Sequence, residues 1–178
     1  MFRIRKKGFT LTELIIVMAL TLVILGMIFQ MFNTNNRIMS DVDIKSTLQN
    51  EGQVIHETLS KIGMQASSIV YNEENFGDDS EKKVDYINLN ILNEDNSKSE
   101  FEIKKDGTEL TIVENKINED DSEKSKISSK RLTDNLKEID IKYHYDKSAQ
   151  VKFILSKKKG YSDIEYSVNV KFAFRNKY

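Results

Sequence analysis

The feature that most constrains this chain is an apolar run near its N-terminus, which contains no charged residue from Leu14 to Asn36. The wider stretch from Phe9 to Phe32 is long enough to cross the hydrocarbon core of a bilayer as a helix, which takes about 20 residues. A helix that is apolar all round is stable only in an apolar environment. This part of the chain therefore requires a membrane, or other apolar helices, around it.

Charge before the run predicts its orientation. Four basic residues precede it: Arg3, Arg5, Lys6 and Lys7. By the positive-inside rule this basic end stays cytoplasmic, so the bulk of the chain lies on the outer side. The run is longer than the ~7–15 apolar residues of a secretory signal, and no small-residue cleavage pattern follows it. A glycine, Gly8, instead precedes it.

One acidic residue, Glu13, lies inside the run. A carboxylate in a membrane helix costs roughly 2.5–3.5 kcal/mol on insertion scales, and such residues usually have a function. The alternative is an incidental charge, because Glu13 lies close enough to the start of the run to reach the membrane surface.

The order of these residues resembles a known family. The segment KKGFTLTEL (residues 6–14) followed by an apolar run is similar to the prepilin leader of type IV pilins and type II secretion pseudopilins. In that family a membrane peptidase cuts after the glycine and methylates the new N-terminus. The resemblance implies that residues 1–8 are a leader, that cleavage falls between Gly8 and Phe9, and that Phe9 becomes N-methylated. Glu13 is then the fifth residue of the mature chain.

Such a cut gives Glu13 a chemical role. Cleavage converts the neutral amide of Phe9 into a positively charged amine. Residues four apart lie one turn from each other on a helix face, so Glu13 can reach this amine. Pairing with it, on the same chain or a neighbour's, removes the cost of an unpaired carboxylate in an apolar core. We hypothesise that Glu13 sets the axial register between assembled helices. Many major pilins have a proline where this chain has Gln30, which leaves open whether the helix melts locally there.

After Arg37 the pattern becomes amphipathic. Apolar residues recur at helical spacing: Ile44, Leu48, Ile55, Leu59, Ile62, Ala66 and Ile69. We predict one helix from Leu11 to about Val70, with residues 9–36 as its membrane or filament-core part. Residues 37–70 form a stem that packs on a sheet. Gly52 and Gly63 within the stem are either tolerated costs or points of close packing.

Residues 71–178 predict a globular domain of antiparallel strands. Alternating apolar residues indicate strands at 84–92, 100–104, 108–113, 139–145, 151–155 and 164–174. The sequence also predicts hairpin turns at 105–107 and 157–160, a short helical turn at 132–136, and loops at 72–83 and 114–129. The predicted fold class is α+β, with a long N-terminal helix on an antiparallel sheet of about five to six strands. The resemblance implies the same pilin fold.

No candidate catalytic site emerges from the sequence. The chain has two histidines, His56 and His144, and no cysteine, so we predict no metal cluster and no disulfide. It has no nucleophile motif and no phosphate-binding loop, and the acidic residues of the loop at 114–129 lack the spacing of a calcium loop. We predict no enzyme activity, no cofactor and no metal.

The charge balance disfavours binding to polyanions. Of the 27 basic side chains four lie in the leader, so 23 remain against 28 acidic ones. The run Lys157–Lys159 beside Tyr161 could touch DNA, but a solvated turn is the more ordinary interpretation. No specific nucleic acid partner is predicted.

We interpret the chain as a minor pilin of the J/W type, which its sheet domain resembles. Such a subunit enters a pilus through its N-terminal helix and primes assembly or sits at the tip. The implied partners are other pilin subunits, a prepilin peptidase, the inner-membrane assembly platform and the membrane. The implied location is a single pass through the cytoplasmic membrane with the C-terminal domain outside, then an extracellular pilus or pseudopilus. Two alternatives stay open: a pseudopilin of a type II secretion or competence DNA-uptake system, and a single-span anchored binding or sensor domain whose leader stays uncut.

Overall fold

The computed structural model describes residues 8–71, 81–93, 97–117, 124–144, 148–160 and 162–174, without the side chains of Tyr143 and His144. The chain divides into two units, residues 1–42 and 43–178, and each is considered by itself. Helix α1 (Leu11–Gly63) begins in the first unit and ends in the second.

The described part of the first unit is residues 8–10 and the part of α1 from Leu11 to Val42. From Leu14 to Phe32 every large apolar side chain is more than half exposed. By length and composition α1 is able to cross a membrane, as the uncharged run predicts. These side chains therefore find no apolar partner within the described part of this unit.

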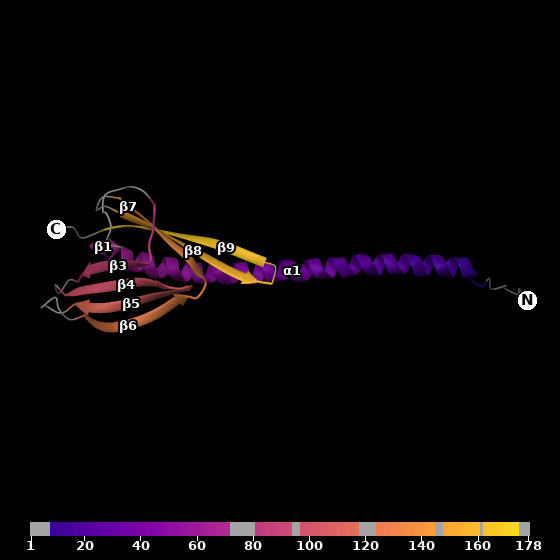
Figure 1. Ribbon diagram of the computed structural model, residues 1–178, viewed down its shortest axis with the longest axis horizontal. Helices are drawn as coiled ribbons and strands as arrows, with labels where there is room; N and C mark the ends of the chain where they lie inside the picture. The colour runs from indigo at the N-terminus through magenta and orange to yellow at the C-terminus, as the bar shows by residue number, and fades with distance from the viewer. Residues whose placement is uncertain are drawn as a thin grey trace, which may run out of the picture. The chain divides into compact units, whose positions relative to one another are not determined.

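The second unit contains the end of α1 and two antiparallel sheets (Figure 1). The strands are β1 (Ser68–Tyr71), β2 (Lys82–Lys83), β3 (Tyr86–Leu92), β4 (Lys98–Asp106), β5 (Glu109–Ile117), β6 (Lys124–Thr133), β7 (Leu136–His144), β8 (Ser148–Lys159) and β9 (Ser162–Ala173). The strand orders are β1-β3-β4-β5-β6 and β2-β7-β8-β9. The predicted α+β class is confirmed.

The apolar stripe of the stem is the centre of the core. All of its predicted members are buried, and Leu48 and Ile55 are completely inaccessible to solvent. They join one cluster with side chains from both sheets, such as Leu89 and Phe153. Burying a side chain of this size stabilises the fold by about 1.5–3 kcal/mol.

Two glycines let α1 approach β9 closely. A Cβ atom built on Gly63 would lie 2.4 Å from the ring of Phe172, and one on Gly52 would lie 2.7 Å from side-chain atoms of Tyr166 and Val168. The optimal separation of non-bonded carbon atoms is about 3.5–4.0 Å, so no larger residue fits at either position without movement of its neighbours. Of the two predicted roles for these glycines, close packing is therefore correct. The order of the contacts also shows that β9 runs in the same direction as α1.

The predicted end of the helix is wrong. We expected it near Val70, but α1 ends at Gly63 and Ser68–Tyr71 is strand β1. Two bonds spanning three residues close the turn after the helix: Gln65 N–H to the carbonyl of Ile62, and Ala66 N–H to that of Gly63. Ala66 lies in the connection between α1 and β1, yet it is buried and stands at helical spacing from the stem stripe. The apolar pattern in the sequence therefore continues past the end of the helix.

Three further predictions in the sheet region are also wrong. There are two sheets instead of one, because β2, β7, β8 and β9 pair among themselves in that order and not with β1 or β3–β6. The predicted loop at 114–129 is largely strand, since β5 continues to Ile117 and β6 begins at Lys124. Eight of the ten residues of β6 are exposed, so it has no apolar alternation to reveal it. The predicted helical turn at 132–136 is the end of β6, a two-residue connection and the start of β7.

Both predicted hairpins are found, but each strand continues into the predicted turn. At the first, Lys105 and Asp106 belong to β4, and Gly107, at a φ of 59°, and Thr108 form the turn. At the second, β8 continues through Lys159, and only Gly160, at a φ of 62°, is outside both strands among the described residues. Glycine adopts such positive φ values without the steric cost of a side chain. Most of the predicted loop at 72–83 lies outside the described residues, although Lys82 and Lys83 form β2.

Candidate processing and assembly site

The predicted cleavage point lies in a segment without regular structure, directly before α1. Gly8 has no neighbouring heavy atom within 4 Å of the position where a Cβ would be, and Phe9 is 84% exposed. A peptide bond that is extended and accessible is what a peptidase requires, because helical backbone must unwind before it fits an active site. The leader charges Arg3, Arg5, Lys6 and Lys7 lie outside the described residues.

Glu13 takes part in a capping box at the start of α1. Its Oε2 accepts a hydrogen bond of 2.9 Å from the backbone N–H of Thr10 and another of 2.9 Å from the Thr10 hydroxyl. In return the N–H of Glu13 donates to Oγ1 of Thr10 at 3.3 Å. Reciprocal bonds of this kind satisfy N–H groups that have no partner inside the helix.

The capping box gives Glu13 a partner in the uncut chain. Since α1 begins at Leu11, Phe9 precedes the helix and does not share a helical face with Glu13 in this state. Any amine created at Phe9 thus competes with Thr10 for the same carboxylate. Every group of the capping box is exposed to solvent, so these bonds are easily exchanged.

Thr10 is the residue that sequence reasoning missed. A threonine hydroxyl inside a helix commonly bonds to the carbonyl four residues earlier, as Thr21 does to Val17 at 2.8 Å. The hydroxyl of Thr10 instead donates to Glu13, and Oγ1 of Thr12 lies 3.0 Å from Oγ1 of Thr10. The available signal was the spacing of Thr10 and Glu13, because a threonine three residues before a glutamate at a helix start is the pattern of a capping box.

The remaining candidate groups do not gather into a reactive site. Among the described residues no three His, Cys, Asp or Glu side chains lie close enough to hold a metal ion. His56 lies on the stem and lines a groove between α1 and β9. Lys159 forms an ion pair of 3.7 Å with Asp43 of α1, while Lys158 is exposed. Tyr161 lies outside the described residues.

The fold and the N-terminal segment together define a class of protein. A long N-terminal helix, apolar and exposed at its start, packs its second half on antiparallel sheets, which is a pilin-like α+β fold. The family model described as the prokaryotic N-terminal methylation motif matches residues 3–29, which include Gly8, Phe9 and Glu13. This match supports a type IV pilin or pseudopilin family member and points to a structural subunit. No curated protein and no solved structure matches the chain.

Proposed function

We propose that this chain is a minor pilin, which a prepilin peptidase cuts between Gly8 and Phe9 and which enters a pilus through α1. The observation that carries the proposal is the coincidence of the methylation motif with an exposed apolar helix surface. That surface is suited first to the membrane and then to the apolar helices of other pilin subunits. The assembly platform of the inner membrane would transfer α1 from the membrane to the filament.

We further propose that the new amine of Phe9 displaces Thr10 from Glu13. In the uncut chain the capping box satisfies the carboxylate within reach of water. In a water-free helix bundle a neutral hydroxyl compensates a buried charge less well than a cation does. A pair formed with the amine of a neighbouring subunit would fix the axial offset between the two helices. Glu13 would therefore favour assembly over residence in the membrane.

The size of the sheet unit fits a role at the tip or in the initiation of filaments, as in minor pilins of the J/W type. A pseudopilin of a secretion or DNA-uptake system uses the same anchoring chemistry and remains the alternative. Deletion of the chain followed by counting of surface fibres addresses the role. Loss of nearly all fibres is expected for an initiator, whereas unchanged fibre number with defective secretion or DNA uptake supports the pseudopilin.

The direct test of processing is mass spectrometry of the chain extracted from membranes and from sheared filaments. We expect residues 9–178 with one methyl group on the amine of Phe9. An intact N-terminus at Met1 in both fractions would reject the pilin function and support an anchored binding or sensor domain.

The test of Glu13 compares two variants. Glu13→Ala should be cleaved normally and remain in the membrane, yet its amount in sheared filaments should fall at least tenfold, the effect of about 1.4 kcal/mol. Thr10→Ala removes the hydroxyl of the capping box but leaves the carboxylate, and it should enter filaments at close to the normal level. Equal defects in both variants would mean that Glu13 acts only as a helix cap.

A further inference from the structure

The four edges of the two sheets are protected unequally. An edge strand presents backbone N–H and C=O groups without a partner, and natural proteins prevent unwanted pairing with short strands, charges or bulges. Edge strands β1 and β2 have only four and two residues. Edge strand β6 has ten residues, but two irregularities interrupt its register with β5. It also carries four basic residues: Lys124, Lys126, Lys130 and Arg131.

Edge strand β9 is neither short nor interrupted. Its twelve residues pair with β8 along their whole length without a register shift. It contains no proline, and of its three charged residues, Asp163, Glu165 and Lys171, the carboxylate of Glu165 is paired with Lys137 of β7. A long and regular edge with a single basic residue is the kind that accepts another strand.

The backbone groups that face outward on β9 follow from the pairing of β8. The N–H of Ser156 donates to the carbonyl of Asn135 at 2.8 Å, on the side of β7, so Ser156 and its partner Glu165 do not bond to each other. By alternation the N–H and C=O groups of odd-numbered β9 residues point to the free edge. They belong to Asp163, Glu165, Ser167, Asn169, Lys171 and Ala173. Among the described residues, no backbone hydrogen bond from outside the sheet reaches them.

A second observation confirms this alternation. The carbonyl of Ile139 on β7 accepts the N–H of Val84 at 3.0 Å, so it points away from β8. Ile139 pairs with Phe153, and Phe153 pairs with Val168. Val168 therefore bonds to β8, and its neighbours Ser167 and Asn169 do not.

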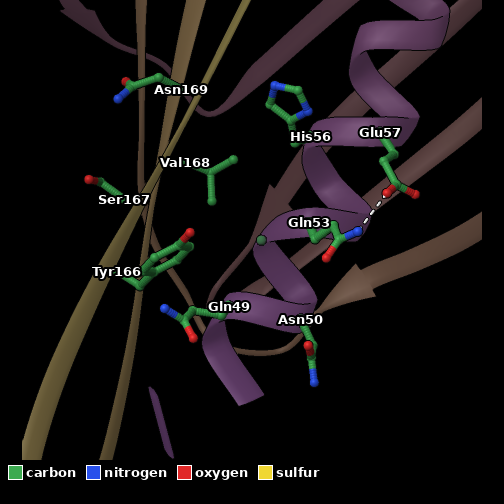
Figure 2. Close-up of a pocket in the computed structure, with 10 residues that line it drawn as sticks. Gln49, Asn50, Gln53, His56, Glu57, Tyr166, Ser167, Val168 and Asn169 are labelled. Carbon is green, nitrogen blue, oxygen red and sulfur yellow. Dashed lines mark hydrogen bonds between the residues drawn. The ribbon is translucent and has the colours of Figure 1, made fainter. Parts of the chain in front are cut away.

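An open groove runs between β9 and the stem (Figure 2). It has a volume of about 700 Å³ and is bounded by residues 49–57 of α1 and residues 166–169 of β9. Most of the polar groups that line it are neutral amides or hydroxyls, including those of Gln49, Asn50 and Gln53 on the α1 side. Amides both donate and accept hydrogen bonds, so they suit the main chain of an extended peptide whatever its sequence. The carboxylate of Glu57 already accepts a bond of 2.8 Å from Gln53.

We propose that β9 pairs with an extended segment of a neighbouring filament subunit, which lies in this groove against α1. The inference rests on the proposed function, since assembly through N-terminal helices brings other subunits beside the stem. The outward N–H and C=O groups of β9 supply the affinity, and the neutral groove selects a segment without charge at its centre. The contact would hold the sheet unit at a fixed angle between neighbours, a task that the apolar helix alone does not perform.

Cysteine chemistry gives a clean test, because the chain has no native cysteine. Full-length Asn169→Cys, labelled with a maleimide benzophenone on intact filaments, should form a photo-adduct with a second subunit. Mass spectrometry should identify that subunit as one with an N-terminal methylation motif. Ser128→Cys, on the protected edge β6, is the matched control and should form no such adduct.

Two substitutions at Ser167 then test the backbone directly in the Asn169→Cys chain. Ser167→Pro removes an outward N–H that makes no bond to β8, so the sheet should fold as before. The yield of the adduct should fall about tenfold. Ser167→Ala keeps the N–H and should leave the yield unchanged. Equal protease resistance of the two variants verifies that both are folded.

The outcomes separate the two proposals. An uncut leader in the parent chain rejects the proposed function. If the chain is cut and present in filaments, any of three results rejects the edge contact alone. They are the absence of an adduct in Asn169→Cys, an undiminished adduct when Ser167→Pro is added, and an adduct to a protein that lacks the methylation motif.

Discussion

Residues 14–32 and residues 43–63 belong to the same helix, yet they solve opposite problems. The first stretch is apolar on every side, and all of its large apolar side chains are more than half exposed. The second is apolar on one stripe, and every member of that stripe is buried by the sheets. The second stretch finds its partner within the chain, whereas the first has to find it in lipid or in other subunits. The spacing of apolar residues therefore indicates which part of a long helix is buried by its own chain and which part needs lipid or another subunit.

The largest expected effect contrasts two leucines of α1. Leu48 is 0% exposed and Leu22 is 69% exposed. Leu48→Ala should lower the free energy of unfolding of the sheet unit by about 2–5 kcal/mol, because it leaves a cavity in the core. Leu22→Ala should leave it unchanged. Urea unfolding of the full chain in detergent micelles, followed by circular dichroism of the β signal, measures both. Equal losses would remove the distinction between the two stretches.

The next effect sharpens the comparison at two glycines. Gly63→Ala places a methyl group against the ring of Phe172 and should cost about 1–3 kcal/mol through overpacking. Gly26→Ala meets nothing within 4 Å and removes a weak helix former, so the sheet unit should be unaffected. The same unfolding assay applies. A neutral Gly63→Ala would show that α1 is free to move away from β9.

A third variant tests a polar contact that ties the stem to the connection between the sheets. The carboxylate of Glu51 accepts a bond of 2.6 Å from the hydroxyl of Thr133 and bonds of 2.9 and 3.0 Å from the amide of Asn135. Glu51→Ala leaves the buried Thr133 hydroxyl without this acceptor and should cost about 1–3 kcal/mol. Glu57→Ala, which loses only an exposed bond to Gln53, is the control and should cost less than about 0.5 kcal/mol.

The sequence predicted the features that depend on neighbours along the chain. The uncharged run, the stem stripe, the hairpin at Gly107 and the strands with apolar alternation all leave local patterns, and each is found in the structure. The division into two sheets depends instead on which edges meet in space, for example the pairing of β2 with β7. Strand β6 escaped detection because it is exposed on both faces and has no alternation.

The candidate site was predictable in part for a similar reason. Gly8, Phe9 and Glu13 lie within a linear motif, so they can be proposed as site residues without knowledge of the fold. The spacing of Thr10 and Glu13 is a local signal of the capping box, but the apolar run around Glu13 predicts a different role for the same carboxylate. The groove at β9 joins residues more than 100 positions apart, and no local pattern links Gln53 to Asn169.

The smallest expected effect concerns a partly exposed ion pair that joins the edge strand β2 to its neighbour β7 in the second sheet. Nζ of Lys83 lies 2.8 Å from Oε2 of Glu138. The hydrogen bond between them lowers the pKa of Glu138 and raises the pKa of Lys83. The carboxylate's share of the stabilisation is thus present above the unfolded pKa of a glutamate and is lost as the pH falls through the lowered folded pKa. The stabilisation contributed by Lys83 is fully present below the unfolded pKa of a lysine and is lost as the pH rises through the raised pKa of the folded state.

We expect Glu138→Gln to lower the unfolding midpoint slightly at neutral pH and low salt. Its difference from the parent chain should disappear in strong acid, because the protonated glutamate of the parent and the glutamine of the variant are both uncharged there. The difference should also shrink in molar salt, which screens the ion pair. Lys126→Gln, on an exposed edge strand, serves as the control for loss of a surface charge. A difference between Glu138→Gln and the parent that persists unchanged in acid would show that the side chain acts through packing rather than charge. In that case β2 would be part of the stable sheet, and not a short edge held mainly by an ion pair.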